Sequence, residues 1–342
     1  MKTIRREGVV CRMNKYNLLI QEALEQYGIT NFTANIIRHN ENIAVKIKNH
    51  NDNMQYLLRI HDPITKNLYG VQHTLEGLNA EILLLNELNK KTEISLQRPI
   101  KNKKESYVST VIDCKENATF LCTLLTWIDG TEFTGTEENA EKIAYDLGVL
   151  LAKLHNFSCS WKISSPYIRP IYNIEKYTHL INSLAYGIKE ELFTREQYEI
   201  VLETFESIKA IFNSTMKTKN NWGIIHADLQ GGNIIVNDNL VSPIDFCFSG
   251  YGYFLFDLGI TLCSVKRNLR KKILEGYTTI RNINEEDYNL ISACFILSIL
   301  GAFGFSINNA QRYEWIKRRM PYVTSEYCLK FLNGESFILE ID

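Results

Sequence analysis

Apolar residues recur along the first part of the chain with two alternating spacings, and each spacing predicts one kind of element. At residues 16–27 they recur every three or four positions, which is the spacing of an amphipathic helix, and Gly28 supplies a stop. A second stripe of this kind runs from residue 75 to about residue 89. Short runs with strand-like composition lie between polar turns at residues 32–38, 42–48, 55–60, 107–113 and 119–125. The pattern predicts a small antiparallel sheet with a leading helix and one further helix.

Beyond Trp127–Gly130 the spacing becomes mainly helical, and its clearest stripe covers residues 140–154. Residues 291–307 carry no charge, but small and polar residues interrupt them, so we expect a buried helix there and no membrane span. A sheet-bearing lobe followed by a helical lobe is an α+β arrangement. We expect the two lobes at residues 1–126 and 127–342, with a tight hinge near residues 124–130.

Composition and charge narrow the classes of function. Of the 342 residues, 45% are hydrophobic and 23% are charged, which is typical of soluble globular proteins. A net charge of -1 provides no broad field for nucleic acid or an anionic membrane, so we expect neither as a partner. Residues 1–7 are basic but lack the apolar core of a secretory signal, and we expect a cytoplasmic protein. The eight cysteines have no metal-binding spacing, which indicates reduced, mostly buried thiols.

The strongest candidate chemistry lies where strand-like runs enclose a polar loop. Strand, loop, strand, turn and strand follow one another at residues 222–225, 226–232, 234–236, 237–239 and 241–244. The last two strands form an antiparallel hairpin, so Asn233 at the start of one arm should meet Asp245 at the end of the other. An amide oxygen and a carboxylate at one point suit Mg2+ bound together with a nucleotide. Asp228, on the loop just before them, can accept the proton of an attacking hydroxyl group.

These residues also resemble a known family. His226-Ala227-Asp228-Leu229, Asn233 and Asp245-Phe246 have the order and spacing of a kinase catalytic loop and metal loop. With Asp257-Leu258, they resemble the aminoglycoside phosphotransferase and choline kinase superfamily. The resemblance implies a bilobal protein-kinase-like fold and a phosphotransferase that uses ATP and Mg2+. It assigns the catalytic base to Asp228 and the Mg2+ ligands to Asn233 and Asp245. It assigns supporting roles to His226 and Asp257.

The resemblance extends into the first lobe, where it concerns the nucleotide. The phosphate-contacting cation is either Lys46 or Arg59, and we prefer Arg59 because it lies on the third expected strand, where the family places this cation. Arg59 stands in an apolar run and needs a partner, which Glu81 on the following helix can supply. The first sixty residues contain no glycine-rich loop, so the hairpin that leads to Asn42 would have to cover the phosphates.

The acceptor is less well defined by the sequence. Only eleven residues separate Asp245 from Asp257, which is too few for a long activation segment and favours a small-molecule hydroxyl acceptor. The resemblance implies an amine-bearing alcohol such as an aminoglycoside, choline or homoserine. Two alternatives stay open, a stress-response-type Ser/Thr protein kinase and a nucleotide-binding scaffold that has lost catalysis. We expect a monomer or homodimer, and the residues do not distinguish ATP from GTP.

Overall fold

The structure is a computed structural model that describes residues 16–40, 42–63, 70–113, 116–163, 166–238 and 240–339. Some residues used in the sequence analysis lie outside this range, namely residues 1–7, Cys11, Glu41, Cys114 and Asn239. The chain divides into two compact units. The first comprises Met1–Asp129 and Ile163–Arg169, and the second comprises Gly130–Lys162 and Pro170–Asp342.

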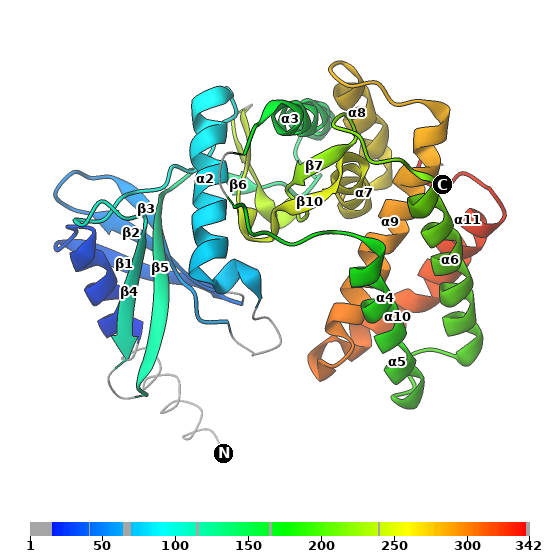
Figure 1. Ribbon diagram of the computed structural model, residues 1–342, viewed down its shortest axis with the longest axis horizontal. Coiled ribbons are helices and arrows are strands. Elements are labelled where there is room, and N and C mark those ends of the chain that lie inside the picture. Colours follow the sequence, from blue (N-terminus) through cyan, green and yellow to red (C-terminus); the bar gives the residue numbers. More distant parts are fainter. Residues whose placement is uncertain are drawn as a thin grey trace. The chain divides into compact units, whose positions relative to one another are not determined.

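The first unit is built on one five-stranded antiparallel sheet (Figure 1). Its strands are β1 (Phe32–His39), β2 (Ile43–Asn49), β3 (Gln55–Ile60), β4 (Val108–Asp113) and β5 (Ala118–Thr126). They lie in the order β1-β2-β3-β5-β4, and every neighbouring pair is antiparallel. The predicted meander of the first three strands is confirmed. The two later runs form a second hairpin, and β5 lies beside β3.

Side chains alternate between the two faces of this sheet, and one face forms the main core of the unit. Val45 and Leu58 are partners on β2 and β3 and are completely buried on that face. They pack in one cluster with Leu24 from the leading helix, which covers residues 16–26 of the described chain. Burying this apolar face against the helix is the main force that holds the two elements together.

The opposite face of the sheet carries polar side chains and meets helix α2 (Leu75–Lys91). Arg59 of β3 lies there beside Thr123 of β5, its partner in the strand register. A short 3-10 turn (Val71–His73) leads into α2, and the hydroxyl of Thr74 then caps the helix by accepting the N–H of Gly77 at 3.1 Å. The second helix of this lobe is thereby confirmed.

The second unit is mainly helical, as expected. Its helices are α3 (Ala140–Ser160), α4 (Ile174–Ser183), α5 (Ala185–Lys189), α6 (Arg195–Ser214), α7 (Phe254–Ser264), α8 (Arg267–Thr278), α9 (Glu285–Ser306), α10 (Tyr313–Tyr322) and α11 (Lys330–Leu332). A π-helical stretch, Val323–Leu329, joins the last two. Helix α3 packs on α8, and α9 packs on α4, α6 and α7 (Figure 1).

Helix α9 contains the long uncharged segment. Among the helices that the structure describes, it alone is long and apolar enough to cross a membrane. However, 67% of its most apolar stretch is buried inside the protein. Its start is closed by a capping box, in which Asn284 and Asp287 each accept the backbone N–H of the other. The expectation of a buried helix is confirmed.

Two small sheets in this unit carry the predicted loop and hairpin. Strands β8 (Ile234–Asn237) and β9 (Leu240–Pro243) form the hairpin, and β6 (Thr131–Glu132) extends it at the side of β8. Strand β7 (Trp222–Ile225), which precedes the loop, pairs instead with β10 (Gly250–Tyr253). The loop at residues 226–232 therefore connects two different sheets.

The cysteines that the structure describes are all free thiols, as expected. Four of these six are buried. Burial raises the pKa of the Cys328 thiol to about 12 and raises the pKa of Cys122 and Cys294 further. These thiols stay protonated near neutral pH and act as small apolar side chains.

Candidate active site

The candidate catalytic loop begins directly after β7 with His226, which is 2% exposed. The Nε2 atom of His226 donates to the carbonyl oxygen of Ile244 at 3.1 Å, and Nδ1 accepts from the backbone N–H of Asp228 at 3.3 Å. A ring nitrogen that accepts from an N–H carries no proton, so this pattern assigns the neutral tautomer protonated at Nε2. The ring also packs against Phe246, with the centroids 4.5 Å apart. His226 thus joins the loop to the strand end that precedes Asp245.

Asp228 is held at both carboxylate oxygens. The amide of Gln230 donates to Oδ1 at 2.8 Å, and the amide of Asn233 donates to Oδ2 at 2.7 Å. The side chain is only partly buried, whereas the loop residues before it are buried. Asp228 therefore has a fixed orientation and access to solvent, which are the two properties that a general base requires.

Asn233 and Asp245 meet at the open end of the hairpin, as the register requires. The backbone N–H of Ile244 donates to the carbonyl oxygen of Asn233 at 3.0 Å, and Asp245 is the next residue. The Asn233 amide nitrogen also donates to the backbone oxygen of Asp228 at 2.9 Å, so both its acceptors lie on the Asp228 side and the amide oxygen faces away. This amide oxygen and the Asp245 carboxylate are the donors that Mg2+ prefers, so the residues present fit the ion.

Two residues of the site have left-handed backbone conformations that non-glycine residues rarely adopt. Ala227 has φ 64° and Asp245 has φ 62°. The Asp257 carboxylate accepts the N–H of Ala227 at 2.6 Å and that of His226 at 2.7 Å. Asp257 is completely buried. Its carboxylate therefore bridges the two backbone N–H groups at the start of the loop.

His155 also belongs to this cluster, although the sequence analysis gave it no role. It lies inside α3, completely buried, with Nε2 at 3.3 Å from Oδ2 of Asp257 and Nδ1 at 2.9 Å from the hydroxyl of Tyr277. Burial lowers the pKa of His155, against the smaller opposite effect of the Asp257 carboxylate. The ring is therefore neutral near pH 7. In the sequence, His155 stands out only as a polar residue on the apolar stripe of α3. This position does not reveal that Asp257 and Tyr277 are its partners.

The first unit contains the predicted cation with its partner. Nη1 of Arg59 is 2.7 Å from Oε1 of Glu81, and both side chains are at least 96% buried. The expected ion pair is confirmed. Nε of Arg59 donates to the hydroxyl of Thr123 at 3.2 Å, and Nε2 of His61 lies 3.2 Å from the same hydroxyl. Burial lowers the pKa of His61 well below its usual value, so the His61 ring is neutral.

The other two nucleotide candidates have different surroundings. Lys46 lies on the same face of the sheet as Arg59. Arg59 is the partner of Ala44 in the β2–β3 register, and Lys46 follows Ala44 by two residues on β2, so the two side chains point to the same face. Its Nζ lies over the ring of Trp127, 4.2 Å from the centroid, in a cation–π contact. Asn42 lies half-buried in the β1–β2 turn, where its carbonyl oxygen accepts the N–H of Asn40 at 3.2 Å.

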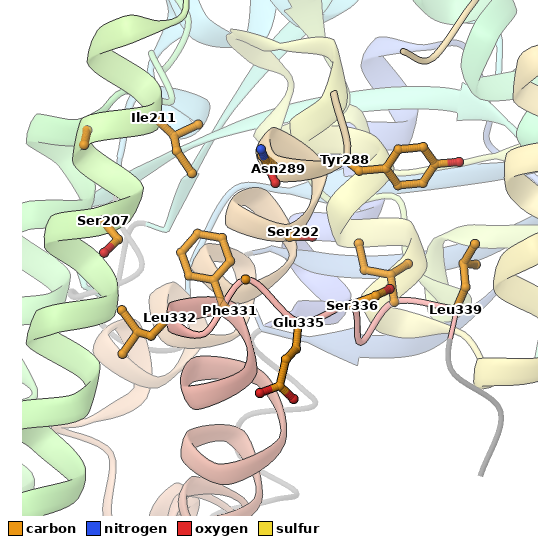
Figure 2. A pocket seen from close by; sticks show the side chains of 13 residues that line it. Ser207, Ile211, Tyr288, Asn289, Ser292, Phe331, Leu332, Glu335, Ser336 and Leu339 are labelled. Atoms are coloured by element: carbon orange, nitrogen blue, oxygen red, sulfur yellow. The ribbon is translucent and has the colours of Figure 1, made fainter. Parts of the chain in front are cut away.

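A cavity of about 520 Å³ lies elsewhere in the second unit, between α6, α9 and the chain from α11 onward. Figure 2 shows Ser207 from α6, Asn289 from α9 and Phe331 from α11 among its lining residues. None of the described residues that line it belongs to the predicted site. The candidate chemistry therefore does not lie in this cavity.

The chain matches a family model described as the phosphotransferase enzyme family, APH, over residues 39–288. The matched region contains all nine residues singled out from the sequence. A curated relative, the amicoumacin kinase of Bacillus subtilis (strain 168), is 23% identical over 248 residues, which are 72% of this chain and 67% of the relative.

Solved structures show the same fold. An amicoumacin kinase in complex with AMP-PNP, Ca2+ and Ami has a TM-score of 0.73 and 16% identity, with 95% of each chain covered. A microcompartment-associated aminopropanol kinase has a TM-score of 0.77 and 16% identity, with 94% of this chain and 99% of that chain covered. The expected protein-kinase-like fold is confirmed.

Proposed function

The chain belongs to the phosphotransferase enzyme family, and from this premise we propose that it moves the γ-phosphoryl group of ATP to a hydroxyl group of a small molecule. The observation that carries the proposal is the orientation of Asp228, whose two carboxylate oxygens accept from Gln230 and Asn233. A carboxylate fixed in this way and partly open to solvent is suited to receive an acceptor hydroxyl.

In the proposed step, Asp228 orients the acceptor hydroxyl and takes its proton. The acceptor oxygen attacks the γ-phosphorus, the bond from the γ-phosphorus to the bridging oxygen breaks, and ADP leaves with the electron pair. His226 does not touch the reacting atoms in this account. Its neutral ring ties the loop to Ile244 and so keeps Asp228 beside the Asn233–Asp245 pair.

Two groups of residues would bind the nucleotide. Asn233 and Asp245 would hold Mg2+, which supplies positive charge to the phosphate oxygens when it is bound. In the first unit, Arg59 would contact the phosphates, with its guanidinium group oriented by Glu81. Lys46 is the weaker candidate for this contact, because its ammonium group lies over the Trp127 ring, whereas the guanidinium group of Arg59 is oriented by Glu81.

For the acceptor we propose an amine-bearing alcohol. One of the similar solved structures is an aminopropanol kinase, which supports this class of acceptor. The chain between Asp245 and Asp257 consists of a 3-10 turn (Phe246–Phe248), Ser249, β10 and the first turn of α7. This short, ordered connection favours a small molecule over a protein acceptor of a phosphorylation-controlled kinase.

The test of the proposal is the Asp228→Asn variant, with ADP release measured across aminoglycosides, choline, homoserine, aminopropanol and a generic protein substrate. Asparagine keeps the shape and the contact with Gln230 but cannot take a proton. We expect phosphotransfer to fall by about 10²- to 10⁴-fold, the usual contribution of a general base. Binding of ATP with Mg2+, measured by calorimetry, should stay close to that of the wild type.

The matched control is Asp238→Asn, the same change at an exposed turn position of the neighbouring hairpin. It should leave both activity and nucleotide binding unchanged. Equal activity of Asp228→Asn and the wild type would show that Asp228 is not the base. Nucleotide binding without transfer to any acceptor would favour the scaffold alternative, and transfer to the protein substrate alone would favour the protein kinase.

A further inference from the structure

A buried row of polar side chains runs behind the catalytic loop within the second unit. It consists of Tyr277 from α8, His155 from α3 and Asp257 from α7, which are at most 1% exposed. The Tyr277 hydroxyl lies 2.9 Å from Nδ1 of His155, and Nε2 of His155 lies 3.3 Å from Oδ2 of Asp257. Beyond Asp257, the row ends at the backbone N–H groups of His226 and Ala227. Three helices are thereby joined to the loop that carries Asp228.

One assignment of donors and acceptors is consistent for the hydrogen bonds of this row. Burial raises the pKa of the Tyr277 hydroxyl well above its usual value, so the phenol stays protonated and can donate a hydrogen bond to Nδ1 of His155. The other ring nitrogen, Nε2, then carries the single proton of the neutral imidazole and donates to Asp257. Phe254 stacks on the imidazole ring, with centroids 4.8 Å apart and an angle of 15° between the planes, and limits its rotation.

Asp257 needs such support because of the backbone that it holds. Ala227 is in the left-handed region at φ 64°, a conformation that is unfavourable for a non-glycine residue and persists only when its surroundings enforce it. The N–H of Ala227 donates to Oδ1 of Asp257, while the N–H of His226 and the His155 ring share Oδ2. A rotation of the carboxylate would release both N–H groups at once. The His155 ring supplies a side-chain contact that can resist this rotation.

We propose that His155 is a positioning residue of the phosphotransfer reaction, which fixes Asp257 and through it the backbone before Asp228. The proposal rests on the function proposed above for Asp228. It predicts that the donor at the Nε2 position matters for turnover, whereas nucleotide binding, which does not involve this donor, stays unchanged.

Two substitutions by amide residues distinguish the roles of Nδ1 and Nε2 of His155. His155→Gln places an amide nitrogen near the Nε2 position and keeps the donor to Asp257. His155→Asn places its amide near the Nδ1 position, so it can keep the contact with Tyr277 but loses the hydrogen bond to Asp257. Both remove the stack on Phe254 and leave similar space, and their stabilities should fall to a similar extent. We expect kcat to fall about 10- to 100-fold in His155→Asn with an unchanged KM for ATP, whereas His155→Gln restores most of kcat.

The activity readout is ADP release with the best acceptor of the panel above, or with water as the acceptor. A second readout is hydrogen exchange of the peptide that contains residues 223–234, which does not depend on any activity. Its exchange should rise in His155→Asn and stay near the wild-type rate in His155→Gln. An inactive wild type would count against the proposed function, and the exchange experiment would still decide the positioning role.

Tyr277→Phe serves as the milder variant if His155→Asn does not fold, because it removes a single hydroxyl. We expect faster exchange of the same peptide and a fall in kcat of about 2- to 10-fold, the effect of losing the hydrogen bond of about 1 kcal/mol to Nδ1 of His155. The control is His179→Asn, on the exposed side of α4, which should change neither readout. Equal behaviour of the Asn and Gln variants at residue 155, in both kcat and exchange, would overturn the proposal.

Discussion

Arg59 is fixed at two of its nitrogens, which a lysine at this position cannot reproduce. Nη1 pairs with Glu81 and Nε donates to the hydroxyl of Thr123, whose oxygen also lies 3.2 Å from Nε2 of His61. A lysine has one nitrogen, so it could keep Glu81 or Thr123 but not both in this geometry. The contact with Thr123 on the neighbouring strand β5 therefore requires arginine at position 59.

Thr123→Val tests this arrangement with a nearly isosteric change. It removes the hydroxyl to which Nε of Arg59 donates and which Nε2 of His61 contacts. We expect the free energy of unfolding to fall by about 1–3 kcal/mol, the penalty for a buried polar group left without a partner. The KM for ATP should rise, because the guanidinium group that we assign to the phosphates becomes free to rotate.

Thr119→Val is the control, since Thr119 lies on the same strand and is exposed. It should change neither stability nor KM. Urea denaturation and steady-state kinetics at varied ATP measure the two effects. An unchanged KM in Thr123→Val, with the expected loss of stability, would separate Arg59 from phosphate binding and direct attention to Lys46.

Helices α3 and α8 approach each other unusually closely, and this contact aligns His155 with Tyr277. A Cβ atom at Gly148 of α3 would lie 2.0 Å from the carbonyl oxygen of Ile273, and one at Gly276 of α8 would lie 1.9 Å from that of Tyr145. Only glycine fits at either position without a shift of the backbone. Gly148 and His155 are seven residues apart and therefore lie on the same face of α3.

Gly148→Ala should force α3 and α8 apart. The expected loss of stability is about 1–3 kcal/mol, as for other overpacked cores, despite the better helix propensity of alanine. Because Tyr277 follows Gly276 directly, the His155–Tyr277 contact should lengthen, and kcat should fall together with stability. Thermal denaturation and ADP release measure the two effects.

Lys153→Ala, at an exposed position of α3, provides the comparison for Gly148→Ala. Its effect on stability should stay within about 0.5 kcal/mol, as is usual for surface substitutions. A Gly148→Ala protein as stable as the wild type would mean that the helix contact has room to adjust, and the glycine would then have no packing role.

Each of the two units contains a buried neutral histidine, which makes the stability of the whole molecule depend on pH. Burial lowers the pKa of His61 in the first unit and of His155 in the second. In the unfolded chain both groups return to a pKa of about 6.5. Below that pH the unfolded chain binds protons that the folded protein does not, and stability falls by up to about 1.4 kcal/mol per pH unit for each group.

We therefore expect stability with respect to these two groups to be constant above about pH 7.5 and to fall between about pH 6.5 and 5. Urea denaturation midpoints across this range measure the effect. His61→Gln should reduce the pH dependence, whereas His179→Asn, at an exposed position, should not. A midpoint that rises on acidification would show that the two rings are charged in the folded protein.

Local patterns predicted most elements and much of the site. The first three strands, α2, α3 and the β8–β9 hairpin follow from spacing and turn residues, because short-range periodicity decides which face of an element becomes buried. The hairpin also brought Asn233 to Asp245, since an antiparallel register joins the two ends of a short segment. The pairing of Arg59 with Glu81 followed from the need of a buried cation for a counter-charge.

The amino-acid sequence by itself determined the secondary structure, the hairpin register and the order of the loop residues, because each depends on neighbours a few positions away. Only the tertiary structure decided which distant polar groups meet. His155 and Asp257 are 102 residues apart, and Arg59 and Thr123 are 64 apart. No spacing rule links such positions, because their contact depends on how helices and strands pack once the apolar faces are buried.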